Sequence, residues 1–215
     1  RYWTSRGWAV ADVDYRGSTG YGRSYMDALD GQWGLIDVAD CVAAARFLVA
    51  AGRVDINRIA IKGGSAGGLT VLAALAGYDD FSAGSCRYGV ADLEILANDT
   101  HKFESRYLDR LIGPYPEDRE VYVARSPIHQ TENFQNPMII LQGSEDAVVP
   151  PNQSELIIEA LKVKGIRHSY LLFEGEGHGF RKSENIIRAL ESEYSFFSQI
   201  FGFEPFDDIE STLIL

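Results

Sequence analysis

The chain has 215 residues, 46% hydrophobic and 24% charged, which suits one globular domain with a sizeable core. Its net charge of −11 argues against a nucleic-acid partner, because phosphate-binding surfaces need clustered lysine and arginine. No apolar run reaches transmembrane length and no secretory signal opens the chain, so we expect no membrane partner and a cytoplasmic location. The chain begins at Arg1 rather than at a methionine, which leaves room for a targeting segment upstream.

Apolar strands alternate with helices along the chain. Short apolar runs predict strands at residues 7–14, 59–61, 85–90, 137–141 and 169–173. Apolar residues at helical spacing predict helices at 35–51, directly after Ser65, and at 103–111, 151–164 and 183–201. We therefore predict a single α/β domain over residues 1–215, with a mostly parallel sheet and helices on both faces.

The two cysteines, Cys41 and Cys86, are too few for a disulfide framework and are expected to be small buried residues.

Ser65 stands in the pattern Gly63-x-Ser65-x-Gly67, between a predicted strand and a predicted helix. In this context a tight turn strains the serine backbone, and we expect glycine at Gly63 and Gly67 because a side chain there would collide. The turn exposes the Ser65 hydroxyl at the carboxyl edge of the sheet and aims the amide of Ala66 at a developing oxyanion. The alternatives are a turn without chemistry and a phosphate-binding loop, but the lysine that ends such a loop is absent.

A nucleophilic serine needs a histidine base, which follows the acid in the chain order Ser, Asp, His. Of the four histidines, His178 lies in a glycine-rich loop directly after the fifth predicted strand. His168 heads that strand and suits a structural role, whereas His101 and His129 precede the expected acid. The sequence therefore predicts His178 as the base.

The base in turn needs a carboxylate that orients it. The loop after the strand at 137–141 offers Glu145 and Asp146. Asp146 is preferred because aspartate is the shorter and usual partner, and because it lies three residues past Gly143. Either carboxylate could instead cap the helix that follows Pro150.

Further motifs accompany these three residues. They are residues 15–22, 31–34 with Asp37, Asp55 with 58–61, 63–68, 126–128, 143–151, 175–180 and 201–205. On these motifs, which cover nearly the whole chain, the sequence resembles the prolyl oligopeptidase family of serine peptidases, nearest to its acylaminoacyl-peptidase-like branch. Ser65, Asp146 and His178 fall on the triad positions of that family.

The resemblance implies an α/β-hydrolase fold that cleaves short peptides, or acyl and aminoacyl amides, through an acyl-enzyme. It implies no metal and no organic cofactor. It also implies a β-propeller, the first strands of the sheet and a His-Gly-Gly-Pro-like loop with the second oxyanion donor; residues 1–215 hold none of them, so we expect an N-terminally incomplete catalytic domain. Many members place an arginine just after the catalytic aspartate, where Ala147 and Val148 stand here, which weakens the expectation of endopeptidase or dipeptidyl specificity.

Two other functions stay open at this point: a carboxylic ester hydrolase of the esterase or dienelactone-hydrolase type, and a non-catalytic hydrolase-fold fragment or binding module. The irregular loop with Tyr115 is expected to line the substrate site, because irregular segments above a sheet edge often carry function. Residues 213–215 are expected to fray, although they or an exposed sheet edge could pair with a second copy of the chain.

Overall fold

The computed structural model describes residues 1–99 and 106–215, and four strands in it form one parallel sheet in the order β1-β2-β3-β4. The strands are β1 Ala60–Gly64, β2 Ala83–Arg87, β3 Met138–Gly143 and β4 His168–Phe173. Register pairs Ala60 with Ala83, and Met138 with both Gly84 and His168. Four of the predicted strands are thereby confirmed within a few residues. Because all four run in one direction, their carboxyl ends meet at the same edge of the sheet.

The α-helices of the described residues are α1 Arg23–Asp27, α2 Ile36–Ala50, α3 Ala66–Gly77, α4 Leu93–Asp99, α5 Tyr107–Leu111, α6 Arg119–Arg125, α7 Pro151–Lys164 and α8 Ser183–Phe201, with 3-10 helices η1 Thr4–Arg6 and η2 Pro127–Asn133. The predictions for α7 and α8 are confirmed at both ends. The helix predicted at 103–111 falls partly outside the described residues, and α5 covers its second half. Where the structure describes the chain, no helix has both the length and the apolar character needed to cross a membrane.

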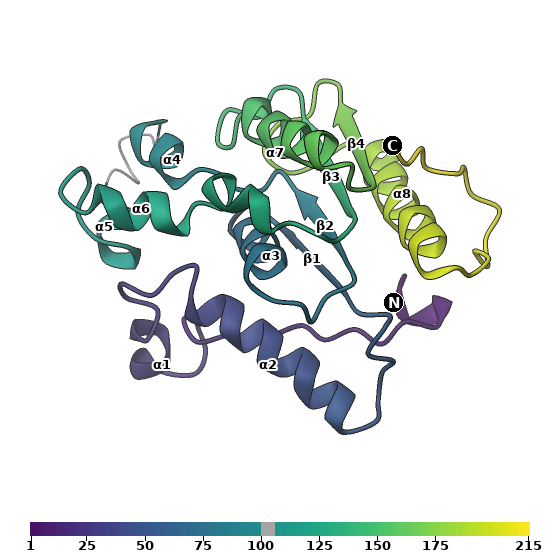
Figure 1. Cartoon of the computed structure of the whole chain (residues 1–215), viewed down its shortest axis with the longest axis horizontal. Helices are drawn as coiled ribbons and strands as arrows, with labels where there is room; N and C mark the ends of the chain where they lie inside the picture. Colours follow the sequence, from purple (N-terminus) through teal and green to yellow (C-terminus); the bar gives the residue numbers. More distant parts are fainter. Residues whose placement is uncertain (100–105) are drawn as a thin grey trace.

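Helices cover both faces of the sheet, as predicted (Figure 1). One face carries Ile61, Cys86 and Ile140, which pack with buried residues of α2, α3 and α7. The opposite face carries Ile139 and Leu141, which pack against α8. The central strand β3 therefore has an apolar core on both sides, which is why its sequence is almost continuously apolar. On the α8 side, β1 and β2 instead carry the polar side chains of Lys62, Ser85 and Arg87, which contact Glu193 of that helix.

The prediction of a strand at residues 7–14 is wrong. The segment adopts no regular structure although its apolar residues suit a strand, and Val10 is 59% exposed. A cavity of about 380 Å³ lies between this segment and β1, lined by residues of both. An apolar run forms a strand only where its backbone groups find partners, and among the described residues no backbone hydrogen bond joins this segment to β1.

The C-terminal residues are docked rather than frayed, which corrects the expectation for 213–215. Leu215 and His168 exchange two backbone hydrogen bonds of 2.8 and 3.0 Å, so the tail pairs with the first residue of β4. Ile214 packs against the cluster between the sheet and α8. Backbone pairing and apolar burial together hold a terminus that composition alone suggests is mobile.

Candidate active site

Ser65 occupies the turn between β1, which ends at Gly64, and α3, which begins at Ala66. Its backbone has φ 55° and ψ −119°, a strained conformation for a residue with a side chain. The Ser65 amide donates to the carbonyl of Arg87 at 3.0 Å, which continues the β1–β2 pairing past the end of the strand. The sheet thus fixes this turn at its carboxyl edge, as the sequence predicts.

The glycines around Ser65 allow close backbone packing, but not at both predicted positions. A Cβ on Gly63 would lie 2.3 Å from the carbonyl oxygen of Gly67, so glycine is required there. A Cβ on Gly67 would meet nothing within 4 Å, and the steric argument for that residue is wrong. The second crowded glycine is Gly68, where a Cβ would lie 2.4 Å from the Cα of Gly89.

Ser65, His178 and Asp146 come together at the carboxyl ends of three strands. His178 Nε2 lies 2.8 Å from Ser65 Oγ, and His178 Nδ1 lies 2.9 Å from Asp146 Oδ2. The Asp146 side chain is fully buried and that of His178 is 23% exposed. Each imidazole nitrogen therefore faces one partner, an arrangement in which the histidine can move a proton to or from the serine hydroxyl.

Asp146 rather than Glu145 contacts the histidine. Oδ1 of Asp146 accepts hydrogen bonds from the amides of Val148 and Val149, both at 2.9 Å, and Oδ2 also accepts one from Gln142 Nε2 at 3.3 Å. Burial alone would raise the pKa of Asp146, but the hydrogen bonds from His178 and from the two amides hold that pKa below its ordinary value. The carboxylate is thus charged and fixed in direction at neutral pH.

Tyr88 is a site residue that the sequence analysis missed. It follows β2, has a φ of 36°, and places its ring centroid 5.0 Å from that of His178 and 5.3 Å from that of Phe180. A Cβ on Gly64 would lie 3.0 Å from the Tyr88 ring, so the phenol also packs on the turn before Ser65. The strand predicted at 85–90 includes Tyr88, whereas β2 ends at Arg87, so the prediction placed this residue inside the strand and not at the site.

The other two predicted site residues are Ala66, expected as an oxyanion donor, and Tyr115, expected to line the substrate site. Ala66 is the first residue of α3, so its amide belongs to the first helical turn, whose N–H groups lack intrahelical acceptors. Tyr115 packs its ring on Tyr122, with centroids 5.1 Å apart, and its hydroxyl lies 3.3 Å from Glu94 Oε1. Among the described residues, no hydrogen bond or ring contact joins Tyr115 to the three residues above, so its substrate role stays a prediction.

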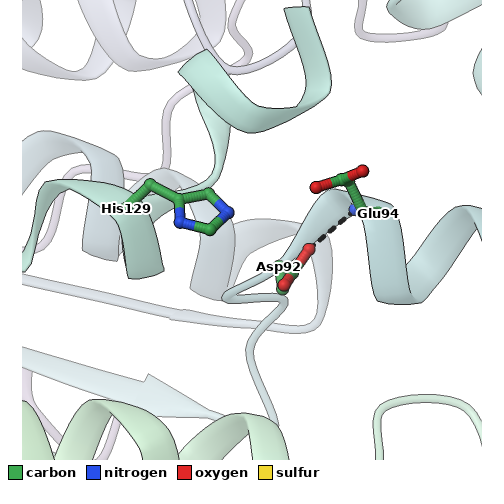
Figure 2. A group of neighbouring side chains, drawn as sticks. All are labelled: Asp92, Glu94 and His129. Atoms are coloured by element: carbon green, nitrogen blue, oxygen red, sulfur yellow. Dashed lines mark hydrogen bonds between the residues drawn. The ribbon is translucent and has the colours of Figure 1, made fainter. Parts of the chain in front are cut away.

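One other cluster has side chains of the kind that bind metal ions: Asp92 and Glu94 at the start of α4, and His129 in η2 (Figure 2). One potential ligand atom from each lies within 4.8 Å of the others. Asp92 Oδ1, however, accepts the amides of Glu94 and Ile95 at 2.8 and 3.2 Å, and Glu94 pairs with Arg119 at 2.6 Å. Both carboxylates thus already have partners within the chain, in a helix cap and an ion pair.

Among the described residues, neither His129 nor His168 takes part in the geometry around Ser65 and Asp146. His168 is buried in β4, where its Nδ1 lies 2.8 Å from the carbonyl of Ile166, in keeping with the structural role expected for it. His101 lies outside the described residues.

Comparison with known proteins places this geometry in a family. The model of the Prolyl oligopeptidase family matches residues 1–204. Dipeptidyl aminopeptidase BIII of Pseudoxanthomonas mexicana is 32% identical over 187 residues, which are 84% of this chain and 27% of that protein. The acylamino-acid-releasing enzyme of Arabidopsis thaliana is 30% identical over 188 residues, which are 82% of this chain and 24% of that protein.

Solved structures of peptidases are also similar to this chain. A puromycin-hydrolyzing peptidase of Mycobacterium tuberculosis matches with a TM-score of 0.91 and 48% identity, over 94% of this chain and 31% of that one. An acylaminoacyl peptidase of Pyrococcus horikoshii matches with a TM-score of 0.76 and 26% identity, over 91% of this chain and 32% of that one. The chain thus spans between 24% and 32% of the length of these relatives. With an α/β-hydrolase fold and a family match over residues 1–204, the chain belongs to the prolyl oligopeptidase family.

Proposed function

We propose that residues 1–215 form one catalytic domain of a serine peptidase, with Ser65 as nucleophile, His178 as general base and Asp146 as the carboxylate that orients His178. The observation that carries this proposal is the pair of contacts of His178, at 2.8 Å to Ser65 Oγ and 2.9 Å to Asp146 Oδ2. The strained turn of Ser65 at the carboxyl edge of a parallel sheet supports it independently.

In the proposed reaction, His178 Nε2 takes the proton of Ser65 Oγ as that oxygen attacks the substrate carbonyl carbon. The amide of Ala66 donates a hydrogen bond to the oxyanion of the tetrahedral intermediate. His178 then gives its proton to the departing amine, and the C–N bond breaks to leave an acyl-enzyme on Ser65. Water, deprotonated by His178, hydrolyses that ester and restores the serine, while Asp146 stabilises the positive charge that His178 carries in both steps.

We propose amides as the substrate class: short peptides, or acyl and aminoacyl amides cleaved near their amino end. Relatives named for dipeptidyl aminopeptidase, acylamino-acid-releasing and puromycin-hydrolyzing activities support this class. Puromycin is a useful first probe because the relative named for hydrolysing it is 48% identical to this chain.

Labelling with a fluorophosphonate tests the nucleophile in the protein at its natural length. We expect labelling of the unsubstituted protein and of Ser211→Ala, an exposed control, and none of Ser65→Ala. Substrate turnover should fall by about 10⁴–10⁶ in Ser65→Ala and in His178→Ala. Absence of labelling, or equal labelling of Ser65→Ala, would favour a non-catalytic binding module.

A substrate panel tests the amide preference. It contains puromycin, an aminoacyl anilide, an N-acylated aminoacyl anilide and a p-nitrophenyl ester. Hydrolysis of any amide that disappears in Ser65→Ala supports the peptidase proposal. Turnover of the ester alone, with every amide intact, would instead assign the protein to the carboxylic ester hydrolases.

A further inference from the structure

A second buried carboxylate lies in the loop that carries His178. This is Glu176, which is only 2% exposed although it lies between β4 and α8, in a loop at the surface. It contacts neither Ser65 nor Asp146 through its side chain. A charged side chain buried in this way needs a structural explanation, because burial of an unpaired carboxylate is strongly unfavourable.

The carboxylate of Glu176 joins the two ends of the His178 loop. Oε2 accepts the amide of Arg181 at 2.9 Å, and Oε1 accepts the amide of Lys182 at 2.9 Å and Asn185 Nδ2 at 2.8 Å. The residue two positions before His178 is thereby tied to residues three and four positions after it, and to the first turns of α8. His178 stands in the middle of the loop that these bonds close.

The backbone of Glu176 is tied to the loop that carries Asp146. Its carbonyl accepts the amide of Glu145, the neighbour of Asp146, at 2.9 Å. A Cβ on Gly143 would lie 2.4 Å from the same carbonyl oxygen, so the two loops pack backbone to backbone. Glu176 thus joins the His178 loop, the Asp146 loop and α8.

The loop needs such a tie because its own sequence does not fix its shape. Three of the residues around His178 are glycines, and two of them, Gly175 and Gly179, have positive φ values of 67° and 89°. Glycine is free to adopt many conformations, so the loop alone would leave the imidazole in several positions. His178, however, has to meet Ser65 and Asp146 together, at 2.8 and 2.9 Å.

We propose that Glu176 is a positioning residue, whose carboxylate closes the His178 loop so that the imidazole reaches Ser65 and Asp146 at once. This inference rests on the triad proposed above. The hydrogen bond from Asn185 and those from the two loop amides lower the pKa of Glu176, so that the carboxylate stays charged wherever His178 acts as a base.

The test compares Glu176→Gln, Asn185→Ala and Val42→Ala in the protein at its natural length. Glutamine keeps the size of Glu176 but turns an NH2 group toward donors that need an acceptor. Asn185→Ala removes one of three donors and leaves both loop amides bound. Val42, which is buried in α2, controls for loss of stability alone.

The readouts are the rate of fluorophosphonate labelling of Ser65 and the downfield proton resonance of the hydrogen bond between His178 Nδ1 and Asp146. We expect labelling to be about 10² slower in Glu176→Gln, with loss of the resonance, because displacement of a catalytic group by an ångström has about that effect. Labelling should be several-fold slower in Asn185→Ala. Val42→Ala should keep both the labelling rate and the resonance of the unsubstituted protein, although its melting temperature falls.

The outcomes separate this inference from the proposed function. If the unsubstituted protein is not labelled at Ser65, the triad proposal fails. If it is labelled, and Glu176→Gln reacts within twofold of Val42→Ala with an unchanged resonance, the positioning role is overturned and the triad stands. If Glu176→Gln does not fold, Asn185→Ala decides: a several-fold slower rate than Val42→Ala supports the role, and an equal rate refutes it.

Discussion

Replacement of Glu193 by glutamine should be among the most destabilising single changes in this chain. Glu193 lies in α8 with its side chain fully buried beneath the sheet. One of its oxygens accepts from Ser85 Oγ at 2.6 Å and Arg87 Nε at 2.7 Å, and the other from Lys62 Nζ and Arg87 Nη2, both at 2.7 Å. Burial opposes the charged form, but the hydrogen bond and charge of Arg87 and the charge of Lys62 lower the pKa of Glu193.

The expected loss of unfolding free energy follows from the charges that Glu193→Gln leaves without a partner. Glutamine keeps the volume but removes the only negative charge of this cluster of four side chains. The Arg87 side chain is 19% exposed, so its charge would stay partly buried without a partner, whereas Lys62, at 38%, can turn toward water. Removing one partner of a buried pair typically costs about 3–5 kcal/mol. Because water can reach Lys62, we expect the lower end, about 3 kcal/mol.

Urea unfolding and calorimetry of the protein at its natural length measure this loss. About 3 kcal/mol should lower the melting temperature by roughly 6–12 °C for a domain of this size. Glu191→Gln, a half-buried position in the same helix, is the control and should stay within about 0.5 kcal/mol. In the double variant Arg87→Met with Glu193→Leu no charge is left buried, so it should be less destabilised than Glu193→Gln. A loss below about 1 kcal/mol in Glu193→Gln would refute the reasoning.

Three further outcomes follow from the structure. Gly63→Ala should lower the unfolding free energy by about 1–3 kcal/mol and slow labelling of Ser65, because its Cβ would lie 2.3 Å from a backbone oxygen; unchanged unfolding and labelling would contradict this. Asp146→Asn should lower kcat by about 10⁴. Because the folded pKa of Asp146 is depressed, the stabilising contribution of this carboxylate is complete above about pH 4 and is lost as the pH falls further. The difference in unfolding free energy between the unsubstituted protein and Asp146→Asn should therefore narrow in acid. Burial raises the pKa of Cys86 to about 12 and that of Cys41 to about 11, so neither thiol should react with dithionitrobenzoate at about pH 8 until urea unfolds the chain.

Much of the fold could be predicted because its signals are local. Helix α7 begins with Pro151 and is followed by Gly165, a left-handed residue with a φ of 65°, and both are boundary signals in the sequence. The apolar runs of β1, β3 and β4 predict strands correctly because each has a partner on at least one side. Residues 7–14 have the same kind of sequence but no partner, and pairing is a long-range property that a local pattern cannot contain. The short helices α1, α4 and α6 were not predicted, since five to seven residues show too little periodicity.

The features of the candidate site also divide into those with a local sequence signal and those that depend on contacts between distant parts of the chain. The meeting of Ser65, Asp146 and His178 could be predicted because each follows a parallel strand, and parallel strands end at one edge. The role of Gly68 could not, because its need for glycine comes from the approach of Gly89, a residue far along the chain. Tyr88 was missed because the strand predicted at 85–90 includes it, whereas β2 ends at Arg87 and Tyr88 turns away with a positive φ that the sequence does not signal.

Helices α4, α5 and α6 pack in a core that is separate from the two cores around the sheet but is shared with the candidate site. Residues of α4, α5 and α6, including Leu93, Leu108 and Tyr122, form a cluster of their own with Trp33 and Val149. The two clusters that hold the sheet between its helices contain none of them. Val149 joins this cluster to the candidate site, because its amide donates a hydrogen bond to Asp146 Oδ1 at 2.9 Å. Leu69 belongs to the same cluster and lies in α3, four residues after Ser65. A substitution that repacks α4, α5 or α6 can therefore move Val149 and Leu69, and with them the groups that contact His178. We expect such substitutions to change the rate of fluorophosphonate labelling of Ser65, whereas the contact of Glu176 with Asn185 of α8 lies outside this cluster.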